Sequence, residues 1–125
     1  MWDVLILIYL INATLLINHE IDSAYWREWD LFGLPGGITG FILLHLPLIF
    51  ILLWGLLLIK DRSLWGLVIS IVTGLGGFFG FVIHVYFLKK GYPEFRTFVS
   101  IGLLAGILIL SLAQVGVSLY VAWGV

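Results

Sequence analysis

The sequence contains no cysteine among its 125 residues, which excludes disulfide bonds and thiolate-rich zinc sites. Charged residues are also scarce: only six are basic and seven are acidic, and the net charge is −1. No basic stripe is present, so nothing in the sequence indicates a nucleic-acid partner. Imidazole and carboxylate groups therefore remain as the only strong ligands for a metal ion.

Three long segments contain no Asp, Glu, Lys or Arg at all: residues 31–59, 63–88 and 97–125. About 20 apolar residues are enough to cross the hydrocarbon core of a bilayer, so each segment can span it once. Residues 3–25 form a fourth apolar segment with a polar cluster near its end. Because 62 % of the chain is hydrophobic, it has too little polar surface for a water-exposed domain.

These segments predict an all-α polytopic membrane protein with a single transmembrane domain over residues 1–125. The N-terminus lacks the basic residues and the cleavage site of a signal peptide, so we expect the first segment to be a retained span. Short connections favour antiparallel packing of consecutive helices, which gives an antiparallel four-helix bundle. The predicted spans are roughly 3–25, 36–59, 64–88 and 97–122.

The basic residues favour one orientation in the membrane. Four of the six lie in loops 26–35 and 89–96, and the other two lie in the connection 60–63. By the positive-inside rule, the two former loops are predicted to be cytoplasmic and both termini to lie outside.

Glycine pairs spaced four residues apart recur in the predicted spans, at positions 36/40, 76/80 and 102/106. Small residues at this spacing let helix backbones approach closely in lipid. We expect these pairs to form packing grooves, which suit a homodimer as well as a tight monomer.

The only three histidines, His19, His45 and His84, lie in the first three predicted spans. Counted at 1.5 Å per helical residue from the loops 26–35 and 89–96, they lie about 12, 12 and 7 Å deep. Titratable groups inside a membrane are costly and mark functional sites. Asp22 follows His19 on the same helix face, where it can bind the same metal or orient the His19 ring through a hydrogen bond. The pattern predicts that His19, Asp22, His45 and His84 bind one divalent metal, with zinc first and iron or manganese as alternatives; a proton relay is the competing interpretation.

Two further carboxylates, Glu20 and Glu94, are candidate catalytic bases at the same membrane face. Their ordinary interpretations are an ion pair of Glu20 with Arg27 and a simple turn around Glu94. With a metal-activated water, the cluster indicates a hydrolase that acts on a lipid or a lipid-like, lipid-linked substrate. The alternatives are a small proton-coupled transporter and a non-catalytic membrane subunit with a structural metal.

The motif His-Glu-Ile-Asp over His19–Asp22, followed by two tryptophans and a second span with His45, resembles small four-span membrane proteins of prokaryotes. The nearest named group is the HXXEE family, which carries His-x-x-Glu-Glu early in a short multi-span chain. Here the same spacing reads His-x-x-Asp-Ser over residues 19–23. The resemblance implies a prokaryotic inner-membrane protein with a metal site near the end of its first span, and it implies no particular reaction.

Overall fold

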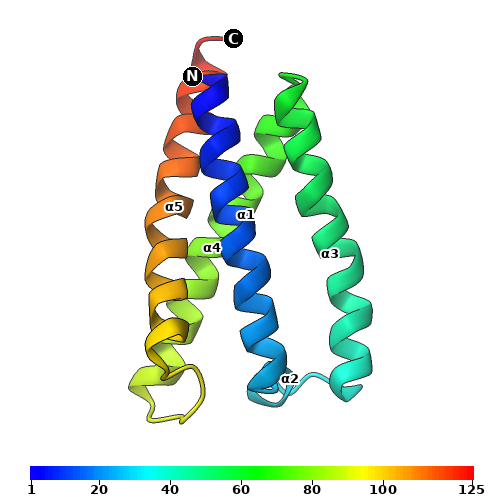
Figure 1. The fold of residues 1–125 in the computed structure, drawn as a ribbon, viewed down its shortest axis with the longest axis vertical. Coiled ribbons are helices and arrows are strands. Elements are labelled where there is room, and N and C mark those ends of the chain that lie inside the picture. The colour runs from blue at the N-terminus through cyan, green and yellow to red at the C-terminus, as the bar shows by residue number, and fades with distance from the viewer.

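The computed structural model describes all 125 residues, and its secondary structure is entirely helical (Figure 1). Its four long helices are α1 (Trp2–Tyr25), α3 (Gly37–Lys60), α4 (Leu64–Lys89) and α5 (Phe98–Trp123), and the short helix α2 (Glu28–Leu31) lies between α1 and α3. The ends of the long helices differ from the predicted ranges by no more than one residue. Each is long and apolar enough to cross a membrane, as in an integral membrane protein. The predicted all-α helical bundle is confirmed.

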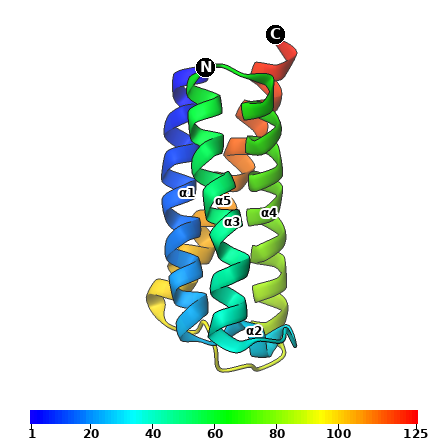
Figure 2. The ribbon, with the colours of Figure 1, turned by 90° about the vertical axis from the view of Figure 1, so that its right-hand side faces the viewer.

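The four long helices run alternately up and down and form a closed ring of antiparallel neighbours (Figure 1). α1 packs against α3 and α5, and α4 packs against the same two helices. Turned by 90°, α3 lies in front between α1 and α4, with α5 behind it (Figure 2). Both termini and the α3–α4 turn lie at one end of the bundle. The opposite end, formed by residues 26–36 and 90–97, is called the loop end below.

Side-chain caps fix where α4 and α5 begin. Ser63 Oγ accepts a hydrogen bond from the backbone N–H of Trp65, and Thr97 Oγ1 accepts one from Ser100. Each cap satisfies one of the amide groups that the first turn of a helix leaves free.

A layer of buried polar side chains joins α1, α4 and α5 in the interior of the bundle. Asn12 Nδ2 donates to Gln114 Oε1 at 2.9 Å and to Ser111 Oγ at 3.2 Å. Gln114 Nε2 donates to the backbone oxygen of Ser70 at 2.8 Å, and Ser118 Oγ donates to Ser70 Oγ. All five residues are buried. Interhelical hydrogen bonds of this kind fix helix pairs in an apolar environment.

Helix α3 is joined to α1 by a different contact. The hydroxyl of Tyr9 donates to the backbone oxygen of Leu52 at 2.7 Å, and Tyr9 is fully buried. Gly55 leaves the space for this ring, because a Cβ at that position would run into Tyr9 and into Ile69 of α4. The three helices therefore meet where a side chain larger than hydrogen has no room.

The small-residue contact between α4 and α5 is made by Gly74 and Gly77, and not by the predicted pair Gly76 and Gly80. A Cβ at Gly77 would overlap the side chain of Ser111. Nothing lies within 4 Å of a Cβ built at Gly76 or at Gly80. The 76/80 pair, predicted to form a packing groove, therefore faces open space, with no other part of the bundle packed at its Cβ positions.

This difference predicts opposite effects for two neighbouring substitutions. Gly77→Ala should lower the free energy of unfolding by about 1–3 kcal/mol, because the methyl group overpacks the contact with Ser111. Gly76→Ala, the matched control, should leave stability unchanged or raise it by about 0.5–1 kcal/mol through higher helix propensity. Unfolding in mixed detergent micelles measures both, and equal destabilisation by the two variants would contradict the assigned contact.

Candidate metal centre

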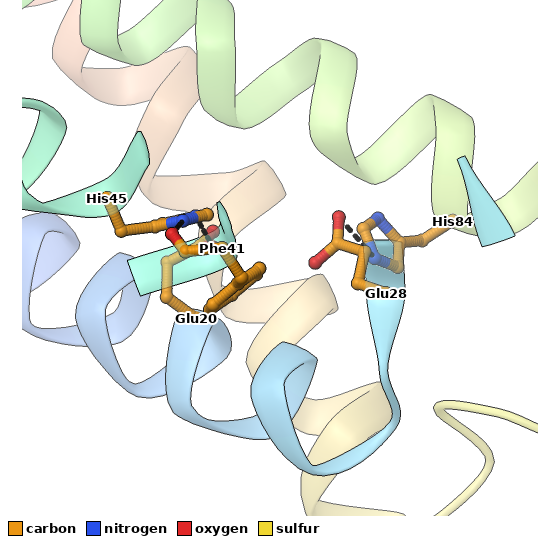
Figure 3. A network of polar contacts seen from close by, with 5 residues as sticks. All are labelled: Glu20, Glu28, Phe41, His45 and His84. Atoms are coloured by element: carbon orange, nitrogen blue, oxygen red, sulfur yellow. Dashed lines mark hydrogen bonds and ion pairs between the residues drawn. The ribbon is translucent and has the colours of Figure 1, made fainter. Parts of the chain in front are cut away.

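Three side chains that can bind a metal meet inside the loop end: His19 from α1, Glu28 from α2 and His84 from α4. One nitrogen of each histidine and one carboxylate oxygen of Glu28 lie within 4.8 Å of one another. The ring centroids of the two histidines are 4.6 Å apart, and His84 Nε2 lies 3.8 Å from Glu28 Oε1. Figure 3 shows the Glu28 carboxylate beside the His84 ring. These three residues are called the metal group.

A sharp reversal of the chain after α1 brings Glu28 into the bundle. Arg27 adopts a left-handed conformation with φ of 54°, so the next residues turn back toward the helices. The Arg27 side chain stays outside, where it pairs with Asp30 at 2.9 Å, while Glu28 is buried. Glu28 was missed in the sequence because it lies in a charged loop segment that is typical of a membrane interface.

The hydrogen bonding of His84 leaves its second nitrogen free for a ligand. His84 Nδ1 lies 2.7 Å from the backbone oxygen of Gly80. A carbonyl oxygen can only accept, so Nδ1 carries a proton, and in the neutral tautomer with this proton Nε2 offers a lone pair to a metal ion. Histidines that bind metals are commonly held by such a bond from the other ring nitrogen.

Buried polar atoms without hydrogen-bond partners gather at this end of the molecule. Such atoms are uncommon in proteins, and each costs about 1–3 kcal/mol when it stays unpaired. A divalent cation would satisfy those of the metal group, so the residues present fit a metal ion. Six of the seven unpartnered atoms belong to residues in or next to the loop end: His19 Nδ1, Asp22 Oδ2, Ser23 Oγ, Glu28 Oε2, His84 Nε2 and Glu94 Oε2.

Two histidines and one glutamate are the ligand set of a catalytic rather than a structural zinc site. Structural zinc has four protein ligands, whereas catalytic zinc has three and keeps one position for water or substrate. A cavity of about 120 Å³ adjoins the metal group and is lined by both histidines and by Glu20 and Glu28. The cavity provides room for a small reacting group beside the metal.

Phe95 covers the metal group from the α4–α5 loop. Its ring centroid lies 4.5 Å from that of His84 and 5.6 Å from that of His19, and the residue is 2 % exposed. The backbone φ of Phe95 is 62°, a left-handed conformation that is strained for a bulky residue. Strain of this kind persists where the surroundings fix the residue, often at a functional site. No sequence pattern distinguishes Phe95 from the other eight phenylalanines.

His45 pairs with Glu20 instead of joining the other two histidines. His45 Nε2 lies 2.5 Å from Glu20 Oε2, and its Nδ1 lies 2.7 Å from the backbone oxygen of Phe41 (Figure 3). The Phe41 ring stacks on the imidazole with a centroid distance of 3.9 Å. Because Nδ1 donates to a carbonyl, the short contact with Glu20 requires one proton between Nε2 and the carboxylate. Glu20 and His45 are called the proton-sharing pair.

The proton-sharing pair lies next to the metal group. Glu20 and Glu28 line the cavity of about 120 Å³, and both also line a neighbouring cavity of about 320 Å³ together with His45. The predicted single cluster is therefore divided into two adjoining groups, connected by the two glutamates.

The remaining candidates from the sequence lie outside both groups. Asp22 Oδ1 accepts a hydrogen bond from Trp26 Nε1 at 2.9 Å, and Asp22 is not part of the metal group. Glu94 is half-buried beside Phe95 and lines neither of the two cavities. The expected ion pair of Glu20 with Arg27 is replaced by those of Glu20 with His45 and of Arg27 with Asp30.

Comparison with protein families gives one match, to a model described as "Family of unknown function (DUF6713)", over residues 5–121. The matched range contains the whole metal group and the proton-sharing pair. No curated protein and no solved structure matches the chain. The resemblance to the HXXEE family gains no support from these comparisons.

The division into two groups predicts which histidines the protein needs in order to bind a metal ion. His84→Ala should reduce the zinc, iron or manganese content of the detergent-purified protein to background, because it removes one of three ligands. The matched control His45→Ala should leave the metal content unchanged. Elemental analysis measures the metal content of both variants. Equal loss of metal in both would support the single site with four ligands that the sequence predicted.

The position of Phe95 predicts slow exchange of the metal with water at the loop end. Phe95→Ala should speed the removal of bound zinc by a water-soluble chelator, since it uncovers both histidines. Removing the ring should also lower the free energy of unfolding by about 3 kcal/mol, the lower part of the range for a buried Phe. Phe79→Ala is the control, because Phe79 lies on the exposed face of α4. An unchanged chelation rate for Phe95→Ala would show that the ring does not shield the site.

Proposed function

We propose that this chain, which belongs to the DUF6713 family of unknown function, is a membrane-embedded metal-dependent hydrolase that acts on a lipid or lipid-linked substrate. The observation that carries the proposal is the metal group, in which buried ligands from three separate elements converge with unpartnered lone pairs. Zinc suits the two imidazoles and one carboxylate best, and iron or manganese would accept the same ligands.

The number of ligands favours an enzyme over a subunit with a structural metal. A closed site needs a fourth protein ligand, but His45 pairs with Glu20, and Asp22 is not part of the metal group. The chain has no cysteine to complete the set. The fourth position of the metal therefore faces the adjoining cavity, where a substrate oxygen or a water can bind.

Glu20 is the residue best placed to act as general base. Its carboxylate lines both cavities, so it reaches the space beside the metal group without being a ligand itself. A divalent cation at this site would polarise the substrate carbonyl and make a bound water more acidic. Glu20 then accepts the proton of the attacking water, whose oxygen bonds to the acyl carbon. The bond to the leaving group breaks, and the leaving oxygen or nitrogen receives the proton.

His45 supports this role by holding the Glu20 carboxylate. The ring is fixed between the Phe41 face and the Phe41 carbonyl, so only its Nε2 side is free to exchange a proton with Glu20. His45 is thus a positioning residue for the base. The proton shared with His45 can move fully to Nε2 when Glu20 accepts the proton of the water.

The location of the site in the bundle fits a substrate that resides in the membrane. His45 lies eight residues from the start of α3, which corresponds to a depth of about 12 Å. The basic residues of the loop end suggest that this end faces the cytoplasm of a prokaryotic cell, with both termini outside. An ester or amide near the headgroups of that leaflet would then be at the level of the metal group.

Replacing the base tests the proposal. Glu20→Gln should keep the metal content and lower the hydrolysis of 4-nitrophenyl palmitate in mixed micelles by about 10²- to 10⁴-fold, as expected for the loss of a general base. Asp30→Asn is the control, because Asp30 is exposed and pairs only with Arg27.

Two other results would change the assignment. Full activity of Glu20→Gln with loss of activity in Glu94→Gln would transfer the role of base to Glu94. A substrate-dependent proton flux in liposomes without any hydrolysis would support the transporter instead.

A further inference from the structure

A groove runs along the outside of the bundle between α1, α3 and α4. It has a volume of about 380 Å³, with Glu20 and His45 at one end and apolar walls that include Leu48, Leu52 and Val72. From His45 to Leu52 the groove follows seven residues of α3, a length of about 10 Å. A polar end followed by an apolar channel matches the shape of an amphiphile.

Both ends of this groove are defined by contacts of the bundle. The far end is lined by Leu52, whose backbone carbonyl accepts the hydrogen bond from Tyr9. At the near end, Glu20 and His45 also line the cavity of about 320 Å³ beside Glu28. The groove therefore leads from the middle of the bundle to the edge of the metal group.

Glycines keep the route from the groove to the metal group open. Gly76 and Gly77 line both the groove and the cavity of about 120 Å³ that contains His19 and His84. A side chain at Gly76 would extend into open space, since nothing lies within 4 Å of its Cβ position. On the opposite side, Phe95 covers the histidines.

A hydrocarbon chain suits the walls of this groove, which are mostly apolar along its length and include Leu48, Leu52 and Val72. The side chains of Glu20 and His45 are 29 % and 16 % exposed at its mouth. Polar groups that face hydrocarbon are costly, so an occupant must also bring a polar group to this end.

We infer that the groove binds one acyl chain of a membrane lipid, which enters sideways between α1 and α3 and brings its ester linkage to Glu20 and His45. This inference rests on the proposed function for the reaction of the ester, but the binding of the chain is independent of the metal. It names the substrate class of the same site: an acyl ester lipid that reaches the metal group from the membrane and not from the loop end.

Photolabelling tests the groove directly. The probe is lysophosphatidylcholine with a diazirine in its acyl chain, added to the purified full-length protein in dodecyl maltoside. We expect labelling that saturates, that unlabelled lysophosphatidylcholine competes away, and that maps to peptides around Leu52 and Val72. Val72→Trp should lower this labelling about tenfold, because the indole displaces several buried methylenes of the chain.

The matched control is Val68→Trp, since Val68 is an exposed valine one turn away on α4 and lines none of the cavities described. It should label like the wild type. Unchanged labelling in Val72→Trp, or labelling spread evenly over all four long helices, would overturn the inference. Disulfide cross-linking of two chains through a cysteine introduced at Val72 would also overturn it, by showing that a second copy covers this face.

A metal-free variant separates this inference from the proposed function. His19→Ala should lose zinc and still label at the groove. Absence of zinc in the wild type together with competed labelling would reject the hydrolase and keep the acyl-chain site. Zinc in the wild type without competed labelling would reject the acyl-chain site and leave the metal-dependent hydrolase standing.

Discussion

The cost of an unpaired polar group in an apolar interior governs how this molecule is organised. In the middle of the bundle, Asn12 and Gln114 find partners in three helices, and their hydrogen bonds fix how α1, α4 and α5 pack. In this layer only Asn12 Oδ1 lacks a partner, whereas at the loop end an atom of each of the buried residues His19, Glu28 and His84 lacks one. The same physical rule that makes the first group structural makes the second a site for a ligand.

The polar layer also explains why the site lies where it does. It connects three helices, whereas α3 has no residue in the layer and is joined to α1 by the bond from Tyr9 to Leu52 and by the proton-sharing pair. The borders of α3 are consequently the places where grooves form, and His45 of α3 meets Glu20 of α1 at one of them. A firm three-helix unit thus holds two metal ligands, while its border with the fourth helix provides access.

The sequence predicted the helices and part of the site, because the pattern of residues along a helix gives its length and the depth of each residue. Charge-free runs fix the lengths of the spans, and counting 1.5 Å per residue fixes depth, so the approach of His19 and His84 was expected. Depth does not fix direction around the helix axis, because each residue rotates by about 100°. His45 has the right depth and faces Glu20. Glu28 and Phe95 depend on left-handed turns at Arg27 and at Phe95 itself, which no hydrophobic pattern specifies.

The strained backbone of Phe95 and the open stripe at Gly76 have complementary effects on the same site. A bulky residue in the left-handed region costs about 1–3 kcal/mol, and packing of the ring against both imidazoles offsets this cost. The ring covers both histidines on the side of the α4–α5 loop, so a water reaches the metal group through the adjoining cavities and not from this side. At Gly76, by contrast, the lack of a side chain leaves space on the membrane side. In the proposed hydrolase, a site covered by Phe95 on the loop side and open between the helices beside Gly76 would favour substrates that reside in the membrane.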